Sequence, residues 1–251
     1  MKAMVFAAGL GTRLRPLTND RPKALVEVGG VTMLERVIVR LIEAGFDDIT
    51  VNVHHFAQKI IDFLATKDNF GVTIHVSDES DLLLDTGGGI LHARQWLDGD
   101  EPFLVHNADI LTDLDLRRFY TDHLKSGAMA SLLVKERVTQ RYFLLDDNNR
   151  LCGWVNKSTG DTRPDGLQYV AGRWRERAFG GVHVISPEIF AELERWSQGN
   201  PVFSITPFYT GECQQHLIRG YEPTEPYHWL DVGKPETLAQ AEALFTKSTT
   251  D

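Results

Sequence analysis

The apolar positions of this chain fall into two patterns that alternate along its first 135 residues. Short continuous apolar runs, typical of buried strands, occur at Ala3–Ala7, Ile49–Val53, Val72–Val76, Phe103–His106 and Ala130–Val134. Stretches with apolar residues at helical spacing lie between these runs, at Met33–Ala44, Gln58–Thr66, Gly89–Leu97 and Leu116–Lys125. This β-α-β-α order predicts an α/β fold with a mostly parallel, mixed sheet that is doubly wound, with helices on both faces.

The pattern changes after residue 135 but remains that of an α/β fold. Strands are expected at Tyr142–Leu145, Leu151–Val155, Phe179–Ile185, Leu217–Arg219 and Trp229–Val232, and helices at Pro187–Glu194 and Pro235–Phe245. The stretch Asn156–Ala178 is polar and rich in glycine, and a loop of this length in a compact domain is usually functional or mobile. We expect one domain over residues 1–246, followed by a short tail at 247–251.

Composition and charge narrow the function classes. The formal net charge of −9 argues against a nucleic-acid binder, which usually has a basic surplus. Cys152 and Cys213 have no metal-ligand spacing and are expected to be free thiols. The N-terminal apolar run is too short for a secretion signal, and no apolar run reaches the roughly 18 residues of a membrane-spanning helix. We therefore expect a soluble, cytoplasmic protein without a membrane partner.

The strongest local signal is a glycine-rich loop directly after the first predicted strand. It reads AAGLGTRLRPLT over residues 7–18 and is followed by Pro22-Lys23. Glycines allow successive backbone N–H groups to face one anion, and Arg13 and Lys23 add cations that suit phosphate oxygens. A plain glycine turn would not need these cations. The loop therefore predicts a phosphate-binding site at the carboxyl end of the sheet.

Two later motifs suit the same kind of ligand. Asp85-Thr86-Gly87-Gly88-Gly89 opens a predicted helix, and glycines are unfavourable in a helix, so we expect a nucleotide to approach their N–H groups closely. The alternative is an ordinary helix cap at Asp85 or Thr86. Asn107-Ala108-Asp109 follows the strand that ends at His106. A carboxylate at the carboxyl end of a strand suits Mg²⁺, which prefers oxygen ligands, although a turn aspartate is the alternative.

The N-terminal loop with Pro22-Lys23 resembles the signature of the sugar-1-phosphate nucleotidyltransferases, which make NDP-sugars from a nucleoside triphosphate and a sugar 1-phosphate. The resemblance covers almost the whole chain and implies a single Rossmann-like domain without the C-terminal β-helix of longer members. Among short members the chain is most similar to N-acetylmuramate 1-phosphate uridylyltransferases, followed by mannose-1-phosphate guanylyltransferase-like proteins. The resemblance divides the domain into a nucleotide-binding half, 1–135, and a sugar-phosphate-binding half, 136–246.

The resemblance also assigns roles to residues. It implies that Asp109 and Asp231 hold Mg²⁺, and that Lys157, Gly180 and Gly181 bind the sugar. The predicted catalytic residues are Arg13, Lys23 and Asp109. The predicted nucleotide-binding residues are Ala7, Ala8, Gly9, Gly11, Thr12, Arg13, Lys23, Asp85, Thr86, Gly87, Gly88 and Asn107.

One departure from the family concerns the sugar end of the predicted site. Asn156 stands where the family has a glutamate before the lysine, so we expect polar residues of the following loop to compensate. The candidates are Arg163, Tyr169, Arg173, Arg175 and Arg177, and the alternative for these is a solvated surface loop.

Three other functions remain open at this stage. A nicotinamide-dependent oxidoreductase would need a third glycine at position 14, where this chain has Leu14, and Glu27 is a poor match for its ribose-binding acid. A non-catalytic nucleotide or NDP-sugar sensor would not need to retain both cations and both aspartates. GTP is an alternative to the favoured UTP, because Glu79 could accept hydrogen bonds from guanine. The sequence does not indicate an oligomeric state.

Overall fold

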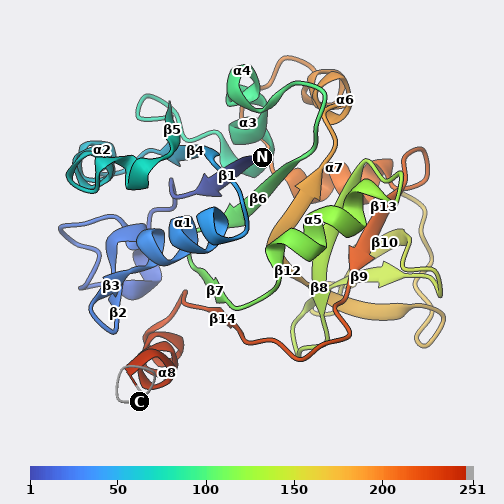
Figure 1. The fold of residues 1–251 in the computed structure, drawn as a ribbon. Coiled ribbons are helices and arrows are strands. Elements are labelled where there is room, and N and C mark those ends of the chain that lie inside the picture. Colours follow the sequence, from blue (N-terminus) through green and yellow to red (C-terminus); the bar gives the residue numbers. More distant parts are fainter. Residues whose placement is uncertain (247–251) are drawn as a thin grey trace.

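The protein is described here from a computed structural model that covers residues 1–246, so the predicted tail, 247–251, lies outside the described residues. Ten strands form one sheet in the order β11-β10-β9-β12-β6-β1-β4-β5, with β8 paired to β12 and β13 paired to β8 (Figure 1). Their bounds are β1 Lys2–Phe6, β4 Asp48–Val53, β5 Thr73–Asp78, β6 Phe103–Asn107, β8 Ala130–Lys135, β9 Arg141–Leu145, β10 Leu151–Asn156, β11 Thr162–Arg163, β12 Arg175–Ile185 and β13 Ile218–Tyr221.

This sheet has a parallel part and an antiparallel part. β6, β1, β4 and β5 are parallel neighbours, and β8 is parallel to β13. β12 is antiparallel to β6, β8 and β9, and β10 is antiparallel to β9 and β11. The mixed α/β sheet predicted from the sequence is confirmed, but the sheet is partly rather than mostly parallel, because its parallel pairings are confined to these two groups of strands. Two short ribbons lie outside the sheet, β2 (Glu27–Val28) with β3 (Val31–Thr32) and β7 (Ile110–Thr112) with β14 (Trp229–Asp231).

Helices cover both faces of the sheet, because alternate residues of each central strand point to opposite sides. On β1, Ala3 and Val5 belong to one core and Met4 belongs to the other. The helices packed on the first core are α1 (Met33–Glu43), α2 (Ala57–Thr66) and α5 (Leu116–Leu124), and those on the second are α3 (Asp85–His92), α4 (Arg94–Leu97), α6 (Ile189–Ser197) and α7 (Ile205–Glu212). The doubly wound arrangement is therefore confirmed.

The C-terminal helix α8 (Pro235–Thr246) lies apart from these layers, beside β2 and β3 (Figure 1). Its residues Leu238 and Ala241 share a small core with Val26 and Val28 of the N-terminal segment. The chain thus returns to the region that follows the glycine-rich loop. None of the described helices has the length and apolar character needed to cross a lipid bilayer.

Several elements of the structure differ from the prediction or were not predicted. The helix expected at Gly89–Leu97 begins at Asp85 and is interrupted at Ala93, so the three glycines lie inside α3. β12 begins at Arg175, earlier than the predicted Phe179, and β11 forms inside the polar stretch. Helix α7 was not predicted, because its sequence has a proline at its third position and weak apolar periodicity.

Three histidines, His106, His123 and His183, are buried in this fold. Burial lowers the pKa of His106 and of His123 from 6.5 to about 4, and that of His183 to about 3. These side chains are neutral in the fold but take up protons below about pH 6.5 when the chain is unfolded. The free energy of unfolding should therefore fall as the pH is lowered from about 6.5 to about 4, by on the order of 3 kcal/mol for each histidine.

Urea unfolding at several pH values between 7 and 4 measures this loss. His123 lies between two hydroxyl groups, with Nδ1 2.8 Å from Ser131 Oγ and Nε2 3.0 Å from Ser186 Oγ. A His123→Gln variant should lose less stability than the wild type across this pH range, because it removes one titrating group. A His55→Gln variant is the control for the loss of an exposed histidine. Equal slopes for the wild type and His123→Gln would contradict the prediction.

Candidate active site

The first part of the glycine-rich loop is fixed by a buried side chain. The amide N–H groups of Ala7 and Ala8 donate to Asn52 Oδ1 on β4, at 2.7 and 3.2 Å. Asn52 Nδ2 in turn donates to Glu79 Oε1 at 2.8 Å, and both side chains are buried. The N–H groups of Ala7 and Ala8 are therefore occupied within the protein and are not open to phosphate. Within residues 1–246, the N–H group of Gly9 donates to no other protein atom, so the open donors begin there.

Gly11 lets the loop turn back toward Lys23. Its φ of +63° is unfavourable for other residues, and a Cβ atom there would lie 2.9 Å from Lys23 Cβ. Thr18 Oγ1 donates to Gly11 O at 2.8 Å and closes the turn. Lys23 follows Pro22 and begins a short 3₁₀ helix, Lys23–Leu25, with its side chain largely buried. The predicted loop residues therefore serve first to place this lysine.

Lys23 and Asp109 form an ion pair at the carboxyl end of the sheet. Asp109 follows β6, and the N–H group of Ala108 donates to Phe6 O of β1 at 3.0 Å, which fixes the backbone before Asp109. Both charged side chains line a cavity of about 430 Å³, together with Ala7, Ala8, Gly9, Asp85, Thr86 and Asn107. The structure thus brings together eight predicted site residues from four segments of the chain.

Asp231 reaches the same edge from the far end of the sequence. β14 is antiparallel to β7, with Asp231 opposite Ile110, and the N–H group of Val232 donates to Asp109 O at 2.8 Å. Asp231 Oδ1 is buried and has no hydrogen-bond partner among residues 1–246. The backbones of the two predicted metal ligands are therefore neighbours, as the resemblance requires.

Arg13 lies outside the lining of the cavity but next to Asp231. The guanidinium of Arg13 packs against Gly233, where an added Cβ atom would lie 3.1 Å from Arg13 Nη2 and 2.7 Å from Asp231 Oδ1. The Arg13 side chain is exposed and ends at the edge shared by Asp109 and Asp231. Gly11 and Thr12 also lie outside the lining of the cavity.

The two aspartates fit a magnesium ion. An unpaired buried carboxylate oxygen is costly unless a ligand satisfies it, and Asp231 Oδ1 is such an atom. Within the described part of the chain, no cluster of three or more His, Cys, Asp or Glu side chains forms a cage for a metal ion. Mg²⁺ is commonly held by one or two carboxylates together with phosphate oxygens and water, so two aspartates are sufficient.

The triglycine segment has a different role from the one predicted. The N–H groups of Gly87 and Gly88 both donate to Phe203 O, at 2.9 and 3.1 Å, so they are not open to a nucleotide. A Cβ atom at Gly87 would overlap the Phe203 ring, and one at Gly88 would overlap Pro201 O. As expected, another group approaches these glycines closely, but that group is the segment Pro201–Phe203 of the protein and not a nucleotide. Of the predicted nucleotide-binding residues in this segment, only Asp85 and Thr86 line the cavity.

Gly180 and Gly181, predicted to bind the sugar, lie beside the cavity. Gly181 has a φ of +73°, and a Cβ atom there would lie 2.9 Å from Asn107 Nδ2. Trp229 Nε1 donates to Gly180 O at 2.8 Å, which ties β14 to β12. These two glycines are therefore close to the strand end that carries Asn107 and Asp109.

The sequence profile of the nucleotidyl transferase family matches residues 2–248. The chain belongs to this family. It is 36% identical over 254 residues to an N-acetylmuramate alpha-1-phosphate uridylyltransferase of Caulobacter vibrioides, covering 98% of this chain and 97% of that one. It is 34% identical over 250 residues to the enzyme of that name from Neisseria meningitidis serogroup B, covering 97% and 98%. The protein is therefore a sugar-1-phosphate nucleotidyltransferase.

Solved structures share the nucleotidyltransferase fold. A putative glucose-1-phosphate thymidylyltransferase from Bacillus anthracis superposes with a TM-score of 0.80 at 19% identity, covering 98% of this chain and 95% of that one. HddC from Yersinia pseudotuberculosis, complexed with GMP-PN, superposes with a TM-score of 0.72 at 21% identity, covering 97% and 99%. At these identities the likeness supports the fold alone.

The third predicted sugar residue of the nucleotidyltransferase, Lys157, lies elsewhere. Its Nζ pairs with Glu176, which raises the pKa of Lys157, and lies 4.8 Å from the centre of the Tyr142 ring. Tyr169 also donates to Glu176. These residues line a separate cavity of about 590 Å³ that includes none of the residues around Asp109. Lys157 therefore lines a different cavity from the one beside Gly180 and Gly181.

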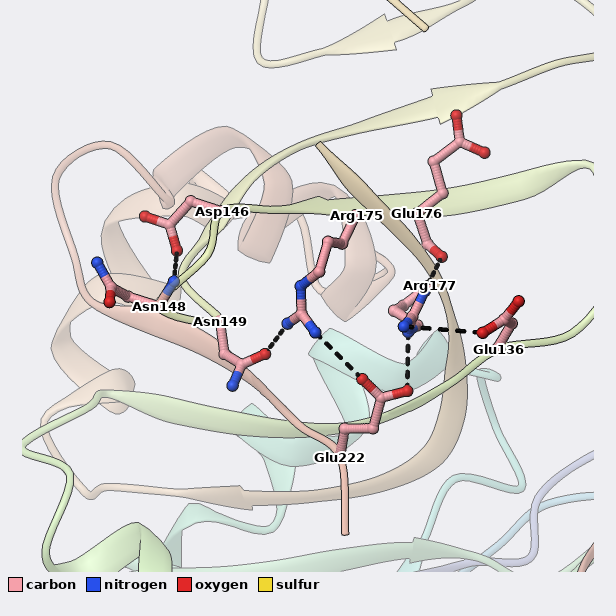
Figure 2. A network of polar contacts seen from close by, with 8 residues as sticks. All are labelled: Glu136, Asp146, Asn148, Asn149, Arg175, Glu176, Arg177 and Glu222. Atoms are coloured by element: carbon pink, nitrogen blue, oxygen red, sulfur yellow. Dashed lines mark hydrogen bonds and ion pairs between the residues drawn. The ribbon is translucent and has the colours of Figure 1, made fainter. Parts of the chain in front are cut away.

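Two of the loop arginines expected to compensate for Asn156 are held by a carboxylate (Figure 2). Glu222 lies between them, 3.5 Å from Arg175 Nη1 and 2.8 Å from Arg177 Nε. Glu136 is a further partner of Arg177, at 3.8 Å. Figure 2 shows both guanidinium groups pointing to Glu222. Arg175 and Arg177 therefore join β12 to the segment after β13 rather than offering free charges to a sugar phosphate.

Sequence reasoning missed the role of Asn52 in this nucleotidyltransferase. Asn52 lies inside the apolar run of β4 and is 2% exposed, so it is buried among apolar neighbours. A polar residue in an otherwise apolar strand is the signal that could have indicated it, because buried polar groups are nearly always hydrogen-bonded. Through Glu79, whose Oε2 accepts from Leu84 N at 3.0 Å, Asn52 connects the glycine-rich loop to the segment before α3.

Proposed function

We propose that this nucleotidyltransferase couples UTP with N-acetylmuramate 1-phosphate, or a closely similar sugar 1-phosphate, to give a UDP-sugar and pyrophosphate. The observation that carries the proposal is the convergence of Lys23, Asp109, Asp231 and Arg13 on one edge of the sheet. Two relatives that this chain matches over nearly their full length, as given above, are named for this reaction. The substrate pair is therefore inferred from these relatives, and the site is inferred from the geometry.

In the proposed reaction an oxygen of the sugar 1-phosphate attacks the α-phosphorus of the nucleotide, and the bond to the pyrophosphate breaks. The attacking oxygen is already anionic, so no base is needed, and the difficulty is repulsion between two anions. Lys23 would neutralise the two phosphates that meet beside Asp109. Arg13, at the open edge, would hold the departing pyrophosphate with its planar fork of donors.

Asp109 and Asp231 would hold Mg²⁺, which supplies positive charge to the phosphate oxygens as the bonds change. Asn52 and Glu79 would position the loop without contacting the reacting atoms. The remaining predicted nucleotide contacts in the cavity are Gly9, Asp85, Thr86 and Asn107.

The alternative substrates are GTP and mannose 1-phosphate. A mannose-1-phosphate guanylyltransferase catalytic subunit beta of Dictyostelium discoideum is 28% identical over 258 residues, but this chain spans only 65% of its length. The case for guanine rested on Glu79 as an acceptor. Both Glu79 oxygens already accept hydrogen bonds within the protein, from Asn52 and from Leu84, which weakens this case for guanine.

Pyrophosphate release over four nucleoside triphosphates, crossed with a panel of sugar 1-phosphates in the presence of Mg²⁺, tests the proposal. We expect the highest kcat/KM for UTP with N-acetylmuramate 1-phosphate. A higher value for GTP with mannose 1-phosphate would establish the alternative pair. If nucleotides bind but no combination releases pyrophosphate, the protein is a non-catalytic binder and the proposal is wrong.

A further inference from the structure

A further cavity, of about 620 Å³, lies at the end of the sheet formed by β9, β10 and β11, and is called the arginine cavity from here on. Arg141 and Phe143 are two residues apart on β9 and therefore share one face of the sheet. Strand register places Arg141 opposite Asn156, and Phe143 opposite Trp154. Arg163 on β11 is opposite Trp154. One face of these three strands thus presents a row of arginine and aromatic side chains to the cavity.

The charges in this cavity are predominantly positive. Three arginines line it, Arg137, Arg141 and Arg163, against one carboxylate, Asp161. Within residues 1–246 none of the three arginines forms an ion pair with a carboxylate. Two of them lie over indole rings, each with Cζ 5.2 Å from the ring centre, which holds the side chains without neutralising them. In a chain with a net charge of −9, such a cluster favours an anionic ligand.

The N-terminus of helix α7 adds to this positive potential. Ser204, Thr206 and Pro207, at the start of the helix, line the same cavity. The N–H group of Ile205 is satisfied by Thr86 Oγ1 at 3.0 Å, which fixes this end of α7 beside the nucleotide cavity. The partial positive charge of a helix N-terminus stabilises an anion placed there.

The arginine cavity adjoins the nucleotide cavity but shares no lining residue with it. The two meet where Thr86 Oγ1 lies 3.4 Å from Ser204 Oγ. They also approach along β12, where Phe179 lines the arginine cavity and Gly181, two residues later, lies against Asn107. A sugar whose phosphate lies near Lys23 and Asp109 would extend past Gly181 into the arginine cavity.

We propose that the arginine cavity is a subsite for a carboxylate carried by the sugar, remote from its 1-phosphate. The inference rests on the proposed function, in which the 1-phosphate occupies the edge beside Lys23. That phosphate cannot occupy the arginine cavity at the same time, so the arginine cavity is available to another anionic group of the same molecule. Guanidinium forks match a carboxylate in geometry, and the rings of Phe143 and Phe179 offer apolar surface to the sugar ring. Arg137, Arg141 and Arg163 would then determine a preference for acidic sugars.

Calorimetric binding with two sugars that lack phosphate tests the subsite without requiring turnover. N-acetylmuramic acid carries a carboxylate, and N-acetylglucosamine is its counterpart without one. In the wild type the acid should bind more tightly. Arg141→Met should weaken binding of the acid by about 10-fold or more and leave N-acetylglucosamine unchanged, since a charge-assisted hydrogen bond is lost only with the acid. Arg117→Met is the matched control, because Arg117 is exposed on α5, is outside this cavity and has no proposed contact with substrate.

The same variants are then compared by KM for the two sugar 1-phosphates. A rise in KM for N-acetylmuramate 1-phosphate alone, with kcat unchanged, is the expected result. Equal weakening of the acidic and neutral sugars, or no weakening of the acidic sugar, would overturn the subsite. If Arg141→Met loses the preference in calorimetry but no sugar 1-phosphate yields pyrophosphate, the subsite holds and the proposed reaction fails.

Discussion

Asp231→Asn is expected to lower kcat by about 100-fold or more without destabilising the fold, because it removes a charge that is proposed to act on bound metal and phosphates. Asp231 Oδ1 is buried without a hydrogen-bond partner among the described residues. An unsatisfied buried oxygen costs stability, so the neutral amide should leave the free energy of unfolding equal to or above that of the wild type. A loss of activity with retained stability separates a ligand role from a structural one.

Thermal unfolding with and without Mg²⁺ and UTP provides a second measurement for Asp231. Ligands that bind only the folded state raise its Tm, so the wild type should be stabilised by the pair. Asp231→Asn should show a much smaller rise. Glu236→Gln, which removes an exposed negative charge from the first turn of α8, is the control and should behave as the wild type. Full activity in Asp231→Asn, or a stability loss that matches its activity loss, would contradict the ligand role.

Local pattern was sufficient for much of the fold. The short apolar runs and the helically spaced stretches are local signals, and the strands and helices of the first 135 residues formed at nearly the predicted bounds. Helix α7, strand β7 and the pairing of β7 with the predicted strand β14 were not predicted in this way. Their residues are stabilised by partners far along the chain, such as Thr86 for the first turn of α7 and Val232 N for Asp109 O. Propensity alone carries no information about such partners.

In the candidate site, too, features set by the local sequence were predictable, and contacts between distant segments were not. The pairing of Lys23 with Asp109 was foreseeable, because each follows a motif at the carboxyl end of a parallel strand. The sequence did not indicate that several backbone N–H groups of the glycine-rich segments are hydrogen-bonded within the protein. Asn52 Oδ1 accepts hydrogen bonds from the N–H groups of Ala7 and Ala8, and Phe203 O accepts hydrogen bonds from those of Gly87 and Gly88. A glycine-rich sequence therefore indicates where the backbone needs room, but not whether a ligand or the chain fills it.

The contacts at the sugar end were the least predictable from sequence, because each charged side chain there has several possible ion-pair partners. Lys157 pairs with Glu176, and Glu222 takes both Arg175 and Arg177 (Figure 2). Glu176 lies on β12 and Glu222 directly follows β13, and only the tertiary structure brings these segments beside the charged side chains that they bind. Arg137, Arg141 and Arg163, which carry the proposed subsite, form no ion pair with a carboxylate within residues 1–246, so the pairing pattern, rather than the number of arginines, identifies that cavity.

Arg13→Met is expected to lower kcat by about 100-fold or more, because its guanidinium is proposed to stabilise charge on the departing pyrophosphate. Arg13 is exposed, so the free energy of unfolding should change by no more than about 0.5 kcal/mol. Arg15→Met is a closely matched control, since Arg15 is an exposed arginine of the same loop, two residues away, and has no proposed contact with substrate. Steady-state pyrophosphate release and urea unfolding of both variants provide the measurements.

The conservative variant Arg13→Lys separates charge from geometry at this position. A lysine retains the positive charge but not the planar fork, so turnover should recover only partly from that of Arg13→Met. The guanidinium lies against Gly233, beside Asp231, which leaves it at the edge where a triphosphate would meet both aspartates. If Arg13→Met and Arg15→Met lower kcat equally, the loop contributes only general positive potential, and the specific role of Arg13 in pyrophosphate departure is wrong.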